Sequence, residues 1–401
     1  MAAPSPALTP PPGNPRFPLL DSLRAFAALS ILLTHCASVS TFNVNNFLGA
    51  YTARMDFGVA IFFLLSGFLL YRPFVTARYE GRPPIRIRDF ARRRVLRIVP
   101  AYWVALVLLA LWPGLVAFWG GPWWRSFTFT QIYWRDSTTQ GIFPAWTLCI
   151  EISFYLALPF VAAAVGRLAG RSWKREVAII GGLALASVTT LTVLQALGGF
   201  YVAQNTLVCY FDWFAYGMLF AVVSVVTHGR ELQLPVLRTV ARRPWVPWLA
   251  FFVAFTVVAY AFGLSRGFYL VFNRWNLTGE HLGYALCAAL LLMPAVFGDW
   301  AGGWPRRLLA NRTLAWLGLV SYGIFLYHGP LVLWLDHHHA ETWLPGSGFL
   351  SIVVIAAAFA ITCAAASYYL VERPVLRFKD GRLRGSRTAS RASAARASAG
   401  A

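Results

Sequence analysis

Residues 19–40 read LLDSLRAFAALSILLTHCASVS, an almost unbroken apolar stretch that contains one arginine and one histidine. A helix that crosses the hydrocarbon core of a bilayer needs about 20 mostly apolar residues. This stretch meets that requirement. Because no small-residue cleavage site follows it, we expect a retained membrane anchor rather than a signal peptide. The stretch therefore predicts a transmembrane helix that holds an arginine and a histidine.

The composition of the whole chain agrees with this prediction. Hydrophobic residues make up 58% of the 401 residues, and charged residues make up 12%. A soluble domain carries roughly 25% charged residues, so this chain lacks the polar surface to face water all round. Aromatic residues supply 16%, which suits belts at two membrane interfaces. The abundance of Arg and Ala over Lys is typical of a GC-rich bacterial genome.

Ten stretches are long and apolar enough to span a bilayer. They lie near residues 19–40, 57–75, 99–118, 145–166, 177–197, 209–227, 245–264, 280–298, 313–335 and 349–371. The sequence predicts an all-α polytopic membrane protein with about ten transmembrane helices over residues 19–378. Residues 1–18 are Pro-rich and residues 379–401 are basic and rich in Ser and Ala, so both are predicted to be disordered and cytoplasmic.

The distribution of positive charge predicts the orientation. With the N-terminus inside, the inner segments hold 28 of the 35 Lys and Arg residues, and the outer loops hold 5. This bias places both termini in the cytoplasm of a cell whose inner (plasma) membrane contains the protein. The net charge of +20 is thereby explained by topology and contact with the lipid bilayer, and no nucleic-acid partner is expected.

The first stretch places Arg24 and His35 on one face of its helix. Eleven residues at 100° each amount to three turns plus about 20°, so the two side chains point the same way, roughly 16 Å apart along the axis. Taken alone, Arg24 fits a side chain that reaches the inner interface beside Asp21, and His35 fits a core histidine. Because a charged group in hydrocarbon is costly, their shared face favours a common functional site.

Three acid–base side chains fall at similar depths below the outer membrane face. For a hydrocarbon core of about 30 Å, His35 lies about 6 Å below the outer edge, Glu151 about 9 Å and His328 about 8 Å. Asp56 and Asp212 lie just above this layer, at the outer ends of the second and sixth spans. The sequence therefore places the buried titratable groups on the outer side of the membrane.

Arginines dominate the opposite side. Arg72 ends the second span, and Arg94 and Arg97 lie one turn apart on the amphipathic lead-in to the third span. Positive-inside topology with lipid headgroup contact is one interpretation. A bound phosphate-bearing ligand is the other, because the guanidinium fork matches phosphate oxygens. The sequence leaves both interpretations open for Arg94 and Arg97.

The other motifs indicate neither a metal site nor a bound cofactor. The five cysteines lie in apolar stretches without a CxxC spacing, which is typical of small buried side chains. Residues 336–339 read Asp-His-His-His, but consecutive loop residues rarely all reach one ion. The sequence also lacks a P-loop, a G-x-S-x-G elbow and a Rossmann fingerprint.

Six segments in order resemble the acyltransferase-3 family of membrane O-acyltransferases. They are LDSLRAFAALSILLTHC (20–36), FFLLSGFLLYR (62–72), RRRVLRIVPAYW (92–103), WTLCIEISFYLALP (146–159), SYGIFLYHGPLV (321–332) and VERPVLRF (371–378). The resemblance implies the family's ten-helix core, and we expect no fused extracellular esterase-like domain. It implies an enzyme that transfers an acyl group, often acetyl, from the co-substrate acyl-CoA to a hydroxyl of a sugar, glycan or secondary metabolite.

Several residues match the family's motif positions. Arg24 and His35 correspond to its essential first-helix pair, Arg94 and Arg97 to its R-x-x-R pair, and Glu151 to its acidic position. The S-Y-x-x-x-x-x-H segment is matched by Ser321, Tyr322 and His328. One departure is Gly329, which stands where an acidic or polar residue is expected before the proline.

The resemblance and the residue pattern together suggest a mechanism. The phosphates of CoA bind the inner arginines, including Arg72, and the pantetheine arm passes Arg24 toward His35. His35 acts as general base on the acceptor hydroxyl, and either Glu151 or His328 orients it. Asp56, Ser321 and Tyr322 are expected to support the site.

A secondary transporter with an Arg–His–Glu proton relay is the main alternative. It accounts equally well for the buried charges. It does not explain the pair Arg94 and Arg97, which suits a phosphate ligand, and the sequence shows no inverted repeat.

Overall fold

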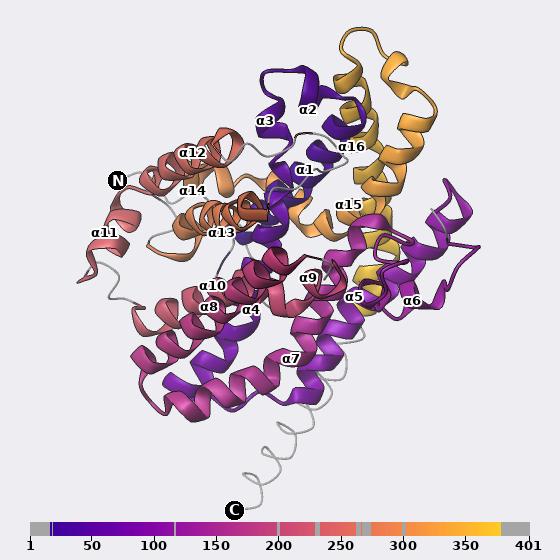
Figure 1. The fold of residues 1–401 in the computed structure, drawn as a ribbon. Coiled ribbons are helices and arrows are strands. Elements are labelled where there is room, and N and C mark those ends of the chain that lie inside the picture. Colours follow the sequence, from indigo (N-terminus) through magenta and orange to yellow (C-terminus); the bar gives the residue numbers. More distant parts are fainter. Residues whose placement is uncertain are drawn as a thin grey trace, which may run out of the picture.

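The computed structural model describes residues 17, 19–115, 118–198, 201–228, 233–261, 266, 274–298 and 302–377. Within these ranges the chain is helical and contains no strand (Figure 1). The all-α prediction is therefore confirmed. Apart from Phe17, the predictions made for residues 1–18 and 379–401 lie outside the described residues.

Ten long helices correspond to the ten predicted spans. They are α1 (Leu20–Val39), α4 (Gly58–Tyr79), α5 (Ile87–Leu111), α7 (Trp146–Ala169), α8 (Trp173–Leu197), α10 (Leu207–Val226), α12 (Trp245–Tyr260), α13 (Arg274–Val296), α15 (Arg312–His337) and α16 (Gly348–Ser367). Over the described residues, nine spans are long and apolar enough to cross a membrane, and there are ten if α12 and α11, which meet at a bend of 100°, are counted as one span. The protein is thus a multi-pass membrane protein.

Short elements connect these helices. They are α2 (Phe42–Asn45), α3 (Gly49–Thr52), η1 (Met55–Phe57), α6 (Trp124–Phe127), η2 (Gln131–Tyr133), η3 (Phe143–Ala145), α9 (Tyr201–Gln204), α11 (Pro235–Arg242), α14 (Trp304–Leu309) and η5 (Ala340–Thr342). A short π-helix, η6 (Tyr368–Glu372), follows α16. Of these, η3 matters most for the site, because it leads directly into α7 and packs against α15.

The third long helix differs most from its predicted span of residues 99–118. Helix α5 begins at Ile87, twelve residues earlier, because its arginine-rich first half is helical although it is not apolar. It ends at Leu111, close to Pro113, which disfavours helical geometry in the residue before it. Arg94 and Arg97 therefore lie on a continuous helix, as the predicted amphipathic lead-in required.

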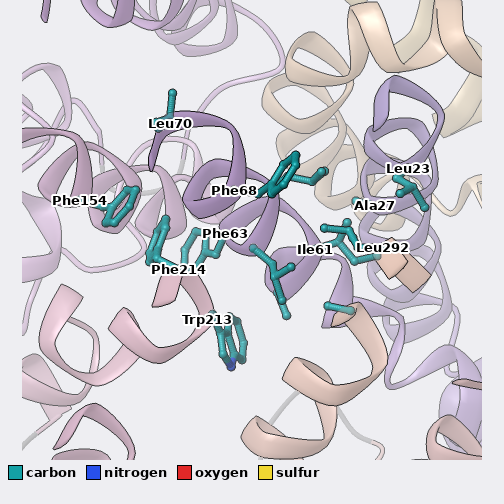
Figure 2. Packing of buried hydrophobic residues seen from close by; sticks show 14 of the residues in the cluster. Leu23, Ala27, Ile61, Phe63, Phe68, Leu70, Phe154, Trp213, Phe214 and Leu292 are labelled. Atoms are coloured by element: carbon teal, nitrogen blue, oxygen red, sulfur yellow. The ribbon is translucent and has the colours of Figure 1, made fainter. Parts of the chain in front are cut away.

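Close contact between α4 and α10 forms the centre of the bundle. Phe214 of α10 stacks between Phe63 of α4 and Phe154 of α7, with ring centroids 4.4 Å and 4.1 Å away (Figure 2). The two backbones approach closely at Gly67 and Gly217, where an added Cβ would collide with the facing helix. Small residues commonly allow such packing in membranes, where apolar burial gives helices little reason to associate.

A second close contact joins α1 to α15. These helices lie side by side, and a Cβ added to Gly318 would collide with the backbone of Asp21. Ser22 donates a hydrogen bond of 2.5 Å to the Leu309 carbonyl just before α15. Both contacts are near the predicted inner end, and they set how the two helices run toward the outer end.

The predicted orientation can be tested by cysteine labelling. With the five native cysteines removed, we expect Arg88→Cys to resist an impermeant thiol reagent in intact cells, because the exposed Arg88 belongs to the inner loop. The matched variant Arg135→Cys lies at an exposed position of an outer loop and should be labelled. The reverse pattern would contradict the orientation.

Candidate active site

Two histidines meet near the predicted outer ends of α1 and α15. Nδ1 of His35 lies 2.9 Å from Nε2 of His328, and the two rings are nearly parallel, with an interplanar angle of 7°. His328 is fully buried, whereas His35 is partly buried. The structure thus brings together two residues that are 293 positions apart in the sequence.

The hydrogen bonds determine which ring nitrogen carries each proton. Nδ1 of His328 lies 3.0 Å from the carbonyl oxygen of Ile324, which can only accept, so this nitrogen carries the proton of a neutral His328. Nε2 of His328 then accepts from Nδ1–H of His35. Nε2 of His35 is left with its lone pair, which suits a general base.

Local sequence explains how His328 is held. Asn311 caps α15 by accepting hydrogen bonds from the backbone N–H groups of Thr313 and Leu314. Directly after His328, Gly329 lets the η3 segment pack tightly, because a Cβ there would lie 2.7 Å from Pro144. This packing places the Phe143 ring edge-on to His35, with centroids 4.9 Å apart. The unexpected glycine therefore has a packing role.

Glu151 lies at a separate point of the site. Its carboxylate accepts hydrogen bonds from the hydroxyls of Ser66 on α4 and Tyr155 on α7. Among the described residues it contacts these hydroxyls rather than either imidazole of the histidine pair. His328, not Glu151, is thus the hydrogen-bond partner of His35.

Three arginines gather below the histidines, toward the predicted inner face. Arg24 interacts electrostatically with both Arg97 and Arg94, and Arg94 lies 5.8 Å from the centre of the Tyr155 ring. Asp21 forms an ion pair with Arg24 at 2.8 Å, and the carboxylate of Glu151 is close enough to attract Arg94 electrostatically. Nε of Arg94 is buried without a hydrogen-bond partner among the described residues. Clustered guanidinium groups repel one another, so this arrangement favours a bound anion.

Two of the other predicted site residues have structural contacts. Ser321 donates to the Gly318 carbonyl at 2.8 Å within α15, and Tyr322 donates to the Ile98 carbonyl of α5 at 3.1 Å. Tyr322 therefore ties the helix of His328 to the helix of Arg94 and Arg97.

Arg72 and Asp56 face other parts of the bundle. Arg72 donates to Ser224 of α10 at 3.2 Å and lies over the Phe17 ring at 5.0 Å. Asp56 accepts a 2.5 Å hydrogen bond from the Tyr284 hydroxyl of α13. These contacts place Asp56 in a polar network with α13 rather than beside His35.

Sequence reasoning missed two features. Tyr155 lies four residues after Glu151, a spacing that puts both side chains on one helix face and could have revealed the pair. His281 of α13 was also overlooked, although it is ionisable and lies within a predicted span. It lies 2.9 Å from Asp212, and both are buried. This second pair shows that histidine placement alone does not identify the reactive site.

The chain resembles known acyltransferases over most of its length. The family model described as "Acyltransferase domain", that of the acyltransferase-3 family, matches residues 17–369. YrhL of Bacillus subtilis is 28% identical over 379 residues, covering 89% of this chain and 54% of that protein. The peptidoglycan O-acetyltransferase OatA of Listeria monocytogenes is 24% identical over 376 residues, covering 89% and 55%.

A third relative is the O-acetyltransferase OatA of Staphylococcus aureus, 24% identical over 391 residues that cover 90% of this chain and 58% of that protein. The chain therefore spans little more than half the length of these curated relatives. No solved structure matches the chain.

Proposed function

Since this chain belongs to the acyltransferase-3 family, we propose that it is an O-acyltransferase that moves an acyl group, acetyl in the first instance, from acyl-CoA to an acceptor hydroxyl. One observation carries the proposal. His35, which is paired with His328 of α15 and keeps a free lone pair, lies on the same helix as Arg24, three turns beyond an arginine cluster that favours an anion.

The donor site is assigned to Arg24, Arg94 and Arg97. CoA carries phosphates, and guanidinium groups bind phosphate through paired charge-assisted hydrogen bonds. The pantetheine arm extends from these groups along α1 toward the outer end. Glu151 and Tyr155 hold Arg94 in place and are positioning residues on this path.

The transfer step uses the free nitrogen of His35. Nε2 takes the proton of the acceptor hydroxyl as its oxygen attacks the thioester carbonyl carbon. The C–S bond then breaks, and the departing CoA sulfur takes the proton from the imidazolium. The products are an ester and free CoA, and His35 returns to its neutral form. His328 holds His35 in the required tautomer through its own bond to Ile324.

The acceptor class is proposed from the relatives. The Listeria relative is named a peptidoglycan O-acetyltransferase. The histidine pair lies near the outer ends of its helices, which suits a carbohydrate acceptor outside the cytoplasm. We therefore take a glycan hydroxyl, with peptidoglycan as the first case, as the acceptor.

Thiol release from acetyl-CoA tests the proposed function. Purified protein in detergent should release free CoA in the presence of a peptidoglycan glycan fragment, and the fragment should gain the mass of one acetyl group. A secondary transporter would leave the thioester intact. Intact thioester with well-folded protein and every glycan tested would contradict the proposal.

Removing the donor arginines should weaken CoA binding. Arg94→Ala should weaken the binding free energy of CoA by about 1.5–3 kcal/mol if one charged hydrogen bond is lost, and Kd should rise accordingly. Arg97→Ala should act in the same direction. Isothermal titration against CoA measures the effect. The matched control is Arg92→Ala, an exposed arginine on the same helix. Unchanged affinity in the Arg94/Arg97 double variant would make these residues topology signals only.

A further inference from the structure

A cavity of about 170 Å³ lies beyond the histidine pair, at the predicted outer end of α15. Its buried or half-buried walls include Phe143, Pro330, Leu333 and Trp334. The exposed residues Gly114 and His337 lie at its rim, so the cavity opens to the surface there.

One wall of the cavity is formed by the residue that packs on His35. Phe143 lines it and also packs edge-on to His35 at 4.9 Å. Pro330 lines it two residues after His328 on the same helix. Trp334 lies six residues after His328, which is about 9 Å along the helix axis. A molecule in the cavity would therefore reach the histidine pair past Phe143.

The chemistry of the walls differs from that of the arginine cluster. The described residues that line the cavity include no Asp, Glu, Lys or Arg. They do include two aromatic side chains and one histidine with hydrogen-bonding capacity. Trp334 stacks on His338 with centroids 4.1 Å apart, which fixes its indole ring. Rigid aromatic walls with few polar groups suit an uncharged ring with one apolar face and hydroxyls at its edge.

We propose that this cavity binds a neutral sugar ring of the acyl acceptor and presents its hydroxyl to His35. The inference rests on the proposed acyltransferase function and adds the place where the acceptor binds. Trp334 supplies the stacking surface, and His337 at the rim contacts sugar hydroxyls. The acyl chain of the donor is a less suitable occupant, because the cavity opens on the side opposite the arginine cluster.

Kinetics of Trp334 variants test the acceptor assignment. The probes are acetyl-CoA with a tetramer of N-acetylglucosamine or a soluble peptidoglycan glycan strand. Trp334→Ala should raise KM for the carbohydrate about three- to tenfold or more, since a stacking contact is lost. Trp334→Phe should recover part of the loss. CoA binding and acceptor-independent thiol release should stay unchanged. The matched control is Trp123→Ala, an exposed tryptophan of the outer loop that does not line the cavity.

A second variant fills the cavity and keeps the stacking residue Trp334. Leu333→Trp should abolish acetylation of the carbohydrate but leave intact the slow, acceptor-independent thiol release in which water replaces the acceptor hydroxyl. If it instead lowers thiol release from butyryl-CoA more than from acetyl-CoA, the cavity holds the acyl chain and the inference is overturned. An unchanged acceptor KM in Trp334→Ala would also overturn it. If the wild-type protein releases thiol yet acetylates neither carbohydrate, the acceptor assignment fails while the donor chemistry stands.

Discussion

Replacing His35 with glutamine should lower acyl transfer by about 10²- to 10⁴-fold, the usual contribution of a general base. Glutamine can still donate a hydrogen bond to His328, but it cannot accept the proton of the acceptor. Donor binding should persist, because Arg24 lies roughly 16 Å away along α1. The measurement is turnover per amount of monodisperse protein, with CoA binding determined in parallel.

The control for His35 is a second buried histidine. His281→Gln alters a histidine of α13 whose partner is Asp212. Any loss of activity in this variant should follow loss of folded protein, with normal turnover per folded molecule. A well-folded His35→Gln protein with near-normal turnover would refute the role of His35 as base.

The two histidines of the pair should respond differently to the same substitution. His328→Ala should lower turnover by about 10- to 100-fold, as expected when the residue that orients a reactive imidazole is lost. His328→Gln should retain more activity than His328→Ala. Its amide oxygen can accept from Nδ1–H of His35, and its amide N–H can donate to the Ile324 carbonyl. Comparison of His35→Gln, His328→Ala and His328→Gln at saturating acetyl-CoA measures this asymmetry.

The asymmetry separates two assignments of the base. If His328 were the base, His328→Gln would be as inactive as His328→Ala, and His35→Gln would be the tolerant variant. That outcome would reverse the proton positions inferred from the Ile324 contact.

Much of the fold could be predicted because each span carries its own signal. An apolar stretch of about 20 residues defines a membrane helix without reference to the rest of the chain. The start of α5 was harder to predict, because its first turns form a charged, amphipathic segment that hydropathy does not detect. The shared face of Arg24 and His35 was predictable because helix periodicity alone determines it.

The pairing within the site could not be predicted in the same way. Depth estimates placed His35, Glu151 and His328 in one layer, but depth does not say which helices are neighbours. The close approach of α1 and α15 at Gly318 decides that His328 meets His35. The packing of α4 against α7 pairs Glu151 with Ser66 instead, whereas its bond to Tyr155 lies within α7. Such contacts depend on tertiary packing, which no local pattern reports.

Transfer across a sealed membrane tests the central claim most directly. Proteoliposomes would hold the protein in one orientation, with acetyl-CoA only on the side of Arg94 and Arg97 and a peptidoglycan glycan fragment only on the side of His35 and His328. The account predicts acetylated glycan with the wild-type protein and a loss of at least about 10²-fold with His35→Gln. Acetylation only when donor and glycan share one side of the membrane would contradict it.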